Sequence, residues 1–141
     1  VPGGLGVATN WMEYSEALHT LYIGTLWGDI FRYNVKEDRW LPTLQANPGL
    51  RVMAADSHNG LLFALNYFQG YIQVMDLDSG APVGYVLANS LGRFVNVDPM
   101  SMRGVLNTHG HGPYAFSYAD LVRRRPKPQL VAGFGTLRMT R

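Results

Sequence analysis

The sequence contains no cysteine and has few charged residues for its length of 141. Without cysteine it has no disulfide framework, no thiolate nucleophile and no cysteine-based metal site. Cysteine usage therefore does not identify the cellular compartment of the protein. The net charge of +2 is too small for the basic footprint of a nucleic-acid-binding protein. No apolar run approaches the roughly 18 residues that a transmembrane helix needs. Because the chain begins at Val1 with no signal-like segment, we expect a processed form or a piece of a longer polypeptide.

Hydrophobic residues make up 47% of the chain and aromatic residues 12%, which favours a β-rich globular fold. The segment Pro48–Leu87 has short runs of aliphatic, aromatic and β-branched residues, separated by clusters of Gly, Asp, Asn and Pro. Such runs between turn-forming clusters predict consecutive antiparallel strands. Four strands are expected here: Arg51–Ala55, Leu61–Asn66, Tyr71–Leu77 and Val83–Leu87.

The same unit recurs before and after this segment, at a period of about 40 to 44 residues. The second and third copies align without a gap, which places Arg51 on Arg93 and Asp56 on Asp98, while the first copy is aligned from Pro2. The predicted single unit, residues 1–141, therefore contains repeats of about residues 2–44, 48–87 and 90–134. The matched second strands are Leu21–Gly24, Leu61–Ala64 and Val105–Asn107; the third are Ile30–Val35, Ile72–Leu77 and Phe116–Leu121; the fourth are Trp40–Leu44, Val83–Leu87 and Leu130–Phe134.

Four antiparallel strands at this period are typical of a β-propeller blade. Residues Gly70–Gly80 resemble the third strand and turn shared by WD40-like, quinoprotein-like and gluconolactonase-type (SMP-30/NHL) propellers. Residues Asp29–Trp40 resemble a kelch-like blade or a blade of a sensor-kinase propeller. The resemblance covers nearly the whole chain. It is a resemblance to propeller blades in general and does not identify a subfamily. It implies an all-β fold of three four-stranded propeller blades. A β-sandwich or barrel is the alternative, although neither requires matched residues at matched positions.

Three blades do not close a ring, because propellers have four or more. An open end would leave a strand edge and a sheet face uncovered. We therefore expect another protein chain, or copies of this chain, to complete the propeller, and we expect the isolated chain not to be a monomer.

If the first strand of each blade is innermost, the inter-blade loops and the hairpins between second and third strands share one end. Large rings at hairpin tips have little core to fill and often mark partner contacts, although they can also pack on the next blade. The candidate binding residues at this end are Trp27, Tyr67, Phe68, Gln69, Arg93, His109 and His111.

Two of these residues, His109 and His111, are also metal-ligand candidates. They lie two positions apart on an extended segment, so their side chains point the same way. A tetrahedral site needs a further ligand, and the alternative is a glycine-rich hairpin tip that tolerates polar residues.

Asp56 and Asp98 recur at matched turns, which indicates turn capping; resemblance to gluconolactonase-type propellers implies instead a carboxylate ring that binds a cation. Asp56-Ser57-His58 holds the residue types of a catalytic triad, but the three are adjacent and do not converge from separate positions. An Asx-type turn accounts for the same residues.

The run Arg123–Lys127 is the only charge cluster, and it is followed and interrupted by proline. We expect a solvated loop, with docking of an acidic partner or anionic surface as the alternative. If the loop is solvated, replacing Arg123–Arg125 with alanine should leave folding intact.

The function expected from these features is a non-catalytic scaffold or partner-binding module that presents one loop face. The alternative is a metal-dependent hydrolase or lactonase of the gluconolactonase-like six-bladed type. No cofactor is expected, apart from the divalent cation that this alternative implies.

Overall fold

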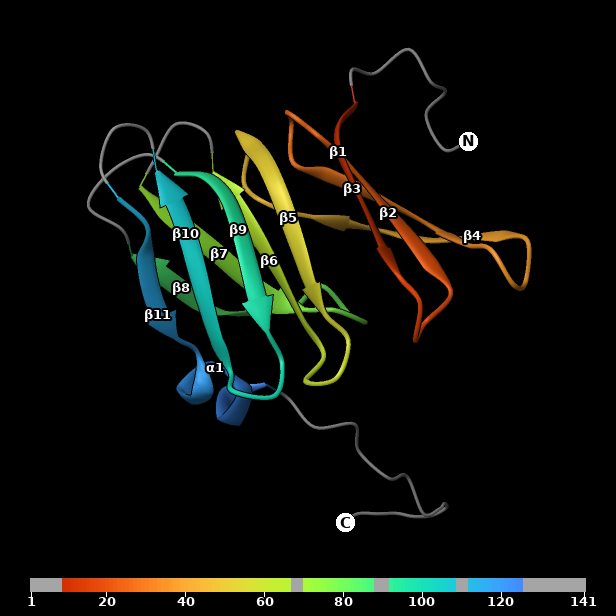
Figure 1. Ribbon diagram of the computed structural model, residues 1–141. Helices are drawn as coiled ribbons and strands as arrows, with labels where there is room; N and C mark the ends of the chain where they lie inside the picture. The colour runs from red at the N-terminus through yellow and green to blue at the C-terminus, as the bar shows by residue number, and fades with distance from the viewer. Residues whose placement is uncertain (1–8, 67–69, 88–91, 109–111, 126–141) are drawn as a thin grey trace.

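The computed structural model describes residues 9–66, 70–87, 92–108 and 112–125. Within these residues the chain forms three antiparallel sheets, which follow one another in sequence (Figure 1). The first sheet has the order β1-β2-β3-β4, the second β5-β6-β7-β8 and the third β11-β10-β9. We call these sheets blades 1, 2 and 3. Their strands are β1 Thr9–Ser15, β2 Thr20–Thr25, β3 Asp29–Asn34, β4 Arg39–Gln45, β5 Leu50–Asp56, β6 Leu61–Asn66, β7 Tyr71–Asp76, β8 Pro82–Leu87, β9 Gly92–Asp98, β10 Arg103–Thr108 and β11 Tyr114–Ser117; the helix α1 spans Ala119–Arg124.

The first strand of each blade is the inner one. Strand β5 lies between β1 and β9 and contacts both (Figure 1). The other strands follow outward in chain order, as in a propeller blade. The second strands of the three predicted repeats, Leu21–Gly24, Leu61–Ala64 and Val105–Asn107, are all second strands of equivalent sheets. The predicted all-β, three-blade architecture is therefore confirmed.

Side-chain oxygens close three of the turns within blades. In each, the residue that ends a strand accepts a hydrogen bond at 2.8–2.9 Å from the amide three residues further on. The acceptors are Asn34, Asp56 and Asp76. This side-chain mimicry of a backbone turn is the reason that Asp and Asn recur at matched positions.

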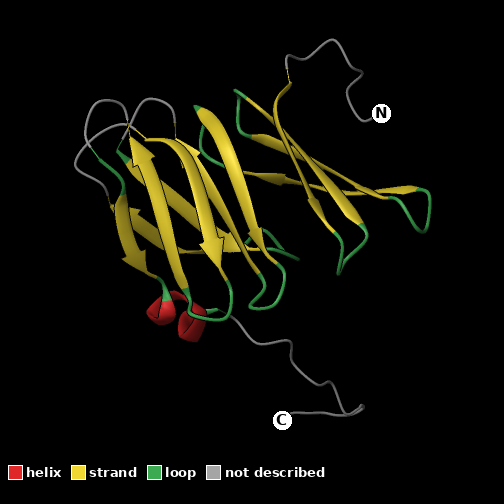
Figure 2. Ribbon diagram, in the orientation of Figure 1, coloured by secondary structure: helices red, strands yellow, loops and turns green. Residues whose placement is uncertain are grey.

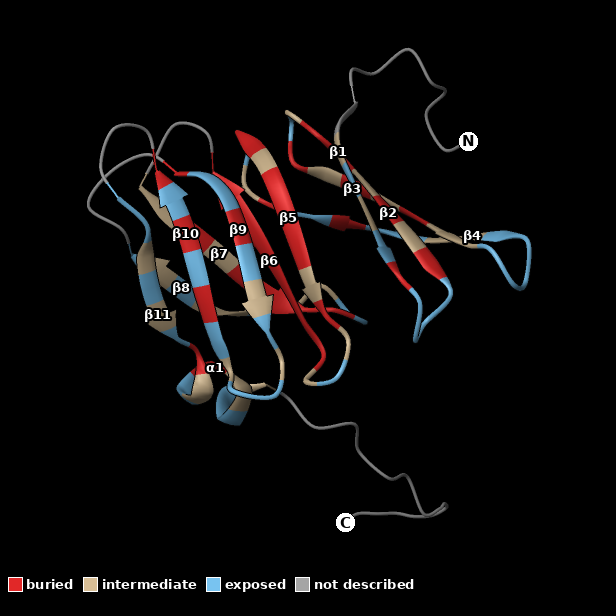
Figure 3. Ribbon diagram, in the orientation of Figure 1, coloured by how far each residue is buried: buried red, intermediate tan, exposed pale blue. Residues whose placement is uncertain are grey.

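The apolar core is divided between the two blade interfaces. Tyr22 and Ile30 of blade 1 pack with Leu62 and Met75 of blade 2 in one cluster. The other cluster, between blades 2 and 3, contains Phe63, Ile72, Val74, Val95, Leu106 and Tyr118. Blade 2 is consequently buried on both sides, and every residue of β6 is buried (Figure 3). The alternation of side chains along the strands predicts burial of Tyr22, Ile30, Phe63, Ile72 and Val74. This is confirmed, since each is at most 1% exposed.

Two boundaries differ from the prediction. In blade 1 the first strand is Thr9–Ser15, and its pairing matches Ser15 with Asp56, so the alignment of the first repeat from Pro2 was shifted. In blade 3 the predicted strand Phe116–Leu121 ends at Ser117, and helix α1 follows it (Figure 2). The predicted strand Leu130–Phe134 lies outside the described residues. No helix among the described residues is long and apolar enough to cross a membrane.

Candidate functional site

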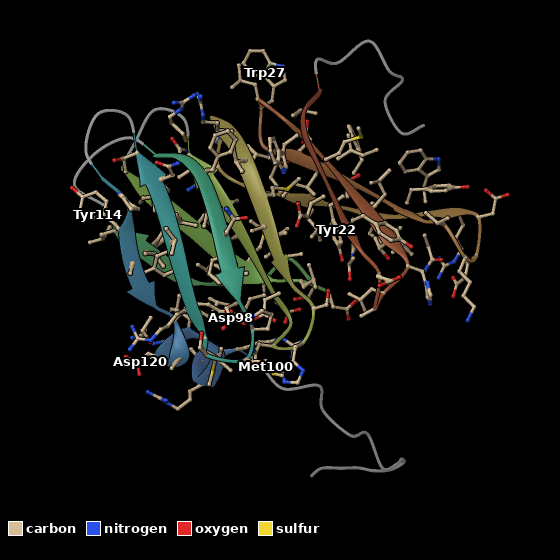
Figure 4. The ribbon with its side chains drawn as sticks, in the orientation of Figure 1. Tyr22, Trp27, Asp98, Met100, Tyr114 and Asp120 are labelled. Carbon is tan, nitrogen blue, oxygen red and sulfur yellow. The ribbon has the colours of Figure 1, made fainter. Side chains whose placement is uncertain are left out.

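The two ends of the blades differ in character. One end, which we call the loop end, carries the β2–β3 hairpin tip at residues 26–28 and the loop between blades 1 and 2 at residues 46–49. The other, which we call the turn end, carries the turns at residues 57–60 and 99–102 together with helix α1. Figure 4 shows Trp27 at the first end and Asp98, Met100 and Asp120 at the second.

Trp27 is held out into solvent at the loop end by a clamped hairpin tip. Its side chain is 64% exposed. The neighbouring backbone is fixed to the inter-blade loop: the Ala46 amide donates to the Gly28 carbonyl at 2.8 Å, and the Gly49 amide donates to the Leu26 carbonyl at 2.7 Å. Because these hydrogen bonds fix the backbone on both sides of Trp27, the indole is exposed on an ordered hairpin tip.

Gly28 is required in this tip for two reasons. Its φ of 95° lies in the left-handed region, and a Cβ atom there would come within 2.3 Å of the Ala46 carbonyl oxygen. The close approach of the hairpin tip to the inter-blade loop therefore depends on glycine. In the sequence, the pair Trp27-Gly28 is the feature that predicts a hairpin tip here.

Of the other predicted binding residues, Arg93 is exposed, with its guanidinium carbon 5.8 Å from the centroid of the Phe94 ring. Tyr67, Phe68, Gln69, His109 and His111 lie outside the described residues, so the pairing of the two histidines as metal ligands remains a prediction. Within the described ranges there is no group of three or more His, Cys, Asp or Glu that could hold a metal ion.

At the turn end, Asp56 is the centre of a buried hydrogen-bond network. Its carboxylate accepts hydrogen bonds from the Asn59 backbone N–H at 2.9 Å, from the Asn59 side-chain Nδ2 at 2.8 Å and from the Tyr118 hydroxyl at 2.7 Å. The Asn59 side chain also donates to the Pro99 carbonyl at 3.0 Å. The network joins blades 2 and 3, so Asp56 acts as a turn cap and an inter-blade link.

Tyr118 is fully buried beneath this network. Burial raises the pKa of its hydroxyl, and the hydrogen bond to the Asp56 carboxylate raises it further. The phenol therefore stays protonated and serves as a donor. Asp98, the matched carboxylate of blade 3, is exposed, and the Ser101 hydroxyl donates to it at 2.7 Å. The two matched aspartates thus share a turn position but differ in burial.

The basic run was predicted to be a solvated loop, and this is wrong for part of it. Arg123 and Arg124 lie in helix α1, where both are exposed. Arg125 instead reaches blade 2, where its Nε atom is 2.5 Å from the Asp76 carboxylate and its guanidinium packs against Gly60. Sequence reasoning missed this ion pair because its partners are 49 residues apart.

Asp76 is buried and charged. Burial opposes ionisation, but hydrogen bonds from the Ser79 amide and hydroxyl and from Arg125 outweigh it, so the pKa of the Asp76 carboxyl lies below its ordinary value. The predicted third strand Phe116–Leu121 would place Asp120 at the position of Asn34 and Asp76, but this is wrong, because Asp120 lies in the first turn of α1. There it pairs with Arg123 on the helix surface.

A recess on the outer edge of blade 2 was not predicted from the sequence. Its volume is about 490 Å³, and its lining residues are Tyr71, Gly84, Tyr85, Leu87 and Arg124. The two tyrosine rings meet edge to face with centroids 5.2 Å apart. The lining combines two phenols and an arginine, which can stack with or hydrogen-bond a ligand but do not form a nucleophile–base pair.

No protein-family model matches the chain, and no curated protein matches its sequence. Solved structures do match in fold. Hydrazine synthase from Kuenenia stuttgartiensis gives a TM-score of 0.71 at 9% identity over 86% of this chain and 37% of that one. The β-propeller domain of Myceliophteria thermophila Cps50 (Swd1) gives 0.68 at 9% identity over 81% and 37%, and Kluyveromyces lactis Hsv2 gives 0.62 at 10% identity over 79% and 33%.

The chain therefore spans about a third of the length of each of these structures, 33–37%. At such low identity the likeness concerns the fold alone. Together with the sheet order and the inner position of β1, β5 and β9, it shows that the chain has the fold of three consecutive β-propeller blades.

Proposed function

We propose that the chain is a non-catalytic part of a larger β-propeller, completed by further blades, and that it binds a protein partner through the loop end. The observation that carries this proposal is the 64% exposure of Trp27 on a tip that hydrogen bonds clamp in place. Large aromatic side chains dominate the binding energy of protein interfaces. A rigid tip presents such a side chain without the entropy cost of ordering a loop on binding.

Arg93 is the second described residue of this surface. Arginine and tryptophan are both enriched among the residues that contribute most to protein interfaces. The alternative, a metal-dependent hydrolase or lactonase, needs several ligands that converge on one ion, and the described residues supply no such cluster.

The test compares three baits, each the full chain: the native sequence, Trp27→Ala and Met100→Ala. Met100 is the matched control, because it is a large apolar side chain, 70% exposed, at the opposite end. Each bait is incubated with extract from the source cells, and retained proteins are quantified by mass spectrometry.

We expect at least one protein to be retained by the native chain and by Met100→Ala but lost with Trp27→Ala. With that protein purified, Trp27→Ala should raise Kd about 30-fold, or about 2 kcal/mol. Identical retention by all three baits would contradict the proposal.

A further inference from the structure

The outer edges of the blades differ in how well they are protected against pairing with a further strand. Among the described elements, β4 of blade 1 pairs only with β3, and β8 of blade 2 pairs only with β7 (Figure 1). In a strand paired on one side, alternate backbone N–H and C=O groups point away from the sheet. Proteins protect such edges with charged residues, with proline or by keeping the strand short.

The edge of β4 has this protection. Pro42 stands in the interior of the strand, where it cannot donate a backbone hydrogen bond, and Arg39 begins the strand. The Pro42 carbonyl already accepts a hydrogen bond from Nε of Arg32 at 2.8 Å. In blade 3, β11 is the outer strand that the structure describes, and it is only four residues long.

The edge of β8 has little protection of this kind. The strand Pro82–Leu87 contains no charged residue, and its proline is the first residue, where it leaves the rest of the edge free to pair. Two large side chains of β8 lie in solvent, since Tyr85 is 53% exposed and Leu87 82%. The strand is also rich in β-branched, aromatic and aliphatic residues, which favour pairing. Of the three outer strands, β8 is therefore the one best suited to accept a further strand.

The recess of about 490 Å³ described above lies at this strand. Its lining residues come from β8, β7 and α1, and they are Gly84, Tyr85, Leu87, Tyr71 and Arg124. Its volume is within the range of ligand-binding sites. The Tyr71 hydroxyl accepts a hydrogen bond from the Asn47 side chain at 3.0 Å, and the Tyr71 ring contacts the Tyr85 ring edge to face. These contacts position the aromatic wall of the recess.

Arg124 is held beside β8 by the packing of α1. Leu121, one turn earlier in the helix, is buried, and a Cβ atom at Gly84 would lie only 2.7 Å from its Cδ2 atom. The same Cβ position is 3.6 Å from Nη1 of Arg124, so the missing side chain at Gly84 lets the guanidinium lie over the strand. On the other side of Arg124, Arg125 is fixed by its ion pair with Asp76.

The guanidinium of Arg124 has no carboxylate partner among the described residues, whereas the neighbouring Arg123 pairs with Asp120. Arginine binds carboxylates through two parallel hydrogen bonds. Residues 126–141, which follow α1 in the sequence, contain no Asp or Glu, and neither does β8. Neither that segment nor β8 of a second copy would therefore bring an acidic side chain to Arg124.

We propose that β8 binds an extended segment of another protein, which adds a strand to blade 2 and carries an Asp or Glu that pairs with Arg124. An apolar side chain of the same segment packs on Tyr85 and Leu87. Gly84 and Leu87 are about 10 Å apart along the strand, so the acidic and apolar residues lie two to four positions apart. Backbone hydrogen bonds give such complexes affinity, and side chains give specificity. This surface does not include Trp27, so the inference does not depend on the loop-end proposal.

The test selects peptides from a random library on the immobilised full chain and measures Kd for synthetic copies of them. We expect an acidic residue two to four positions from a large apolar one. Arg124→Glu should raise Kd tenfold or more, because like charges then meet. The matched control is Arg123→Glu, which makes the same charge change at an exposed residue outside the recess and should leave Kd unchanged. Replacing the acidic residue of the peptide with Lys should restore binding to Arg124→Glu.

A second arm tests strand addition directly. Methylation of single backbone nitrogens of the peptide should abolish binding at alternate positions, because alternate N–H groups point toward the edge of β8. Trp27→Ala should bind the peptide with unchanged Kd, which separates this surface from the loop end.

The inference would be overturned by equal Kd values for Arg124→Glu and Arg123→Glu, by N-methylation effects that do not alternate, or by a native chain that selects no peptide in preference to Arg124→Glu. A peptide that binds only after residues 126–141 are deleted, or only when a second copy dissociates, would show that this chain covers its own edge. That result would overturn the inference as well.

Discussion

The loop end and the turn end are held together in different ways. At the turn end, side chains far apart in sequence meet: Tyr118 donates to Asp56, and Arg125 pairs with Asp76. At the described part of the loop end, backbone hydrogen bonds fix the tip, the Asn47 side chain donates to the Tyr71 hydroxyl at 3.0 Å, and the side chain of Trp27 lies in solvent. The difference is that a buried carboxylate joins two blades at the turn end, whereas a fixed tip exposes a large aromatic ring at the loop end.

The largest effect in this comparison should come from Asp56→Ala. The substitution removes the acceptor of three hydrogen bonds, and it leaves the buried Tyr118 hydroxyl with only the Asp98 carbonyl at 3.2 Å and the Asn59 side chain with only the Pro99 carbonyl. We expect the free energy of unfolding to fall by about 3 kcal/mol or more, measured by denaturant unfolding. Asp98→Ala is the control at the matched turn, and it should change stability little, since Asp98 is exposed. Equal losses of stability in Asp56→Ala and Asp98→Ala would contradict the different roles assigned to the two aspartates.

Asp76→Asn should cost about 1–2 kcal/mol at neutral pH, because it weakens charge-assisted hydrogen bonds from Arg125 and Ser79. The native pKa of Asp76 lies below its ordinary value of 3.8. The stabilisation is therefore present above pH 3.8 and is lost as the pH falls through the lowered native pKa. The native chain should have a higher unfolding free energy than Asp76→Asn at pH 7, and this difference should shrink in the acid range when unfolding is measured down to pH 2. A difference that stays constant with pH would contradict the lowered pKa assigned to Asp76.

Arg125→Ala should have a smaller effect, about 1 kcal/mol, because Arg125 is partly exposed while its partner Asp76 is buried. Arg123→Ala is the matched control from the same basic run, since its pair with Asp120 is exposed on both sides. We expect a lower melting temperature for Arg125→Ala and no measurable change for Arg123→Ala. An equal shift of the melting temperature in both variants would contradict the ion pair assigned to Arg125 and would favour a basic run that is solvated throughout.

Local patterns were sufficient to predict most of the fold. Strands β2 to β8 lie close to their predicted positions, because Gly, Asp and Asn punctuate runs whose faces alternate. The same local reasoning failed after Ser117. The segment Ala119–Arg124 has helix-forming residues and an Asp120–Arg123 pair one turn apart, and Leu121 packs beside Gly84 of blade 2. Matching this segment to strands of the other repeats concealed those signals.

The candidate site was less accessible to sequence reasoning. The place of Trp27 at a hairpin tip was predicted, but the sequence left open whether its ring is exposed or packs on the next blade. The clamp that holds the tip depends on contacts with residues 46–49. The Asp56–Tyr118 pair joins residues 62 positions apart, and no local pattern contains that information.

The division between the two ends is tested most directly by measuring stability and binding on the same two variants, Trp27→Ala and Asp56→Ala. The binding probe is the partner isolated through the loop end, titrated at a temperature where both variants are folded. We predict that Trp27→Ala keeps its unfolding free energy within about 0.5 kcal/mol of the native value while its Kd rises about 30-fold. Asp56→Ala should lose stability and keep its affinity. A Trp27→Ala chain that is destabilised as much as Asp56→Ala, or that binds with unchanged affinity, would contradict the account.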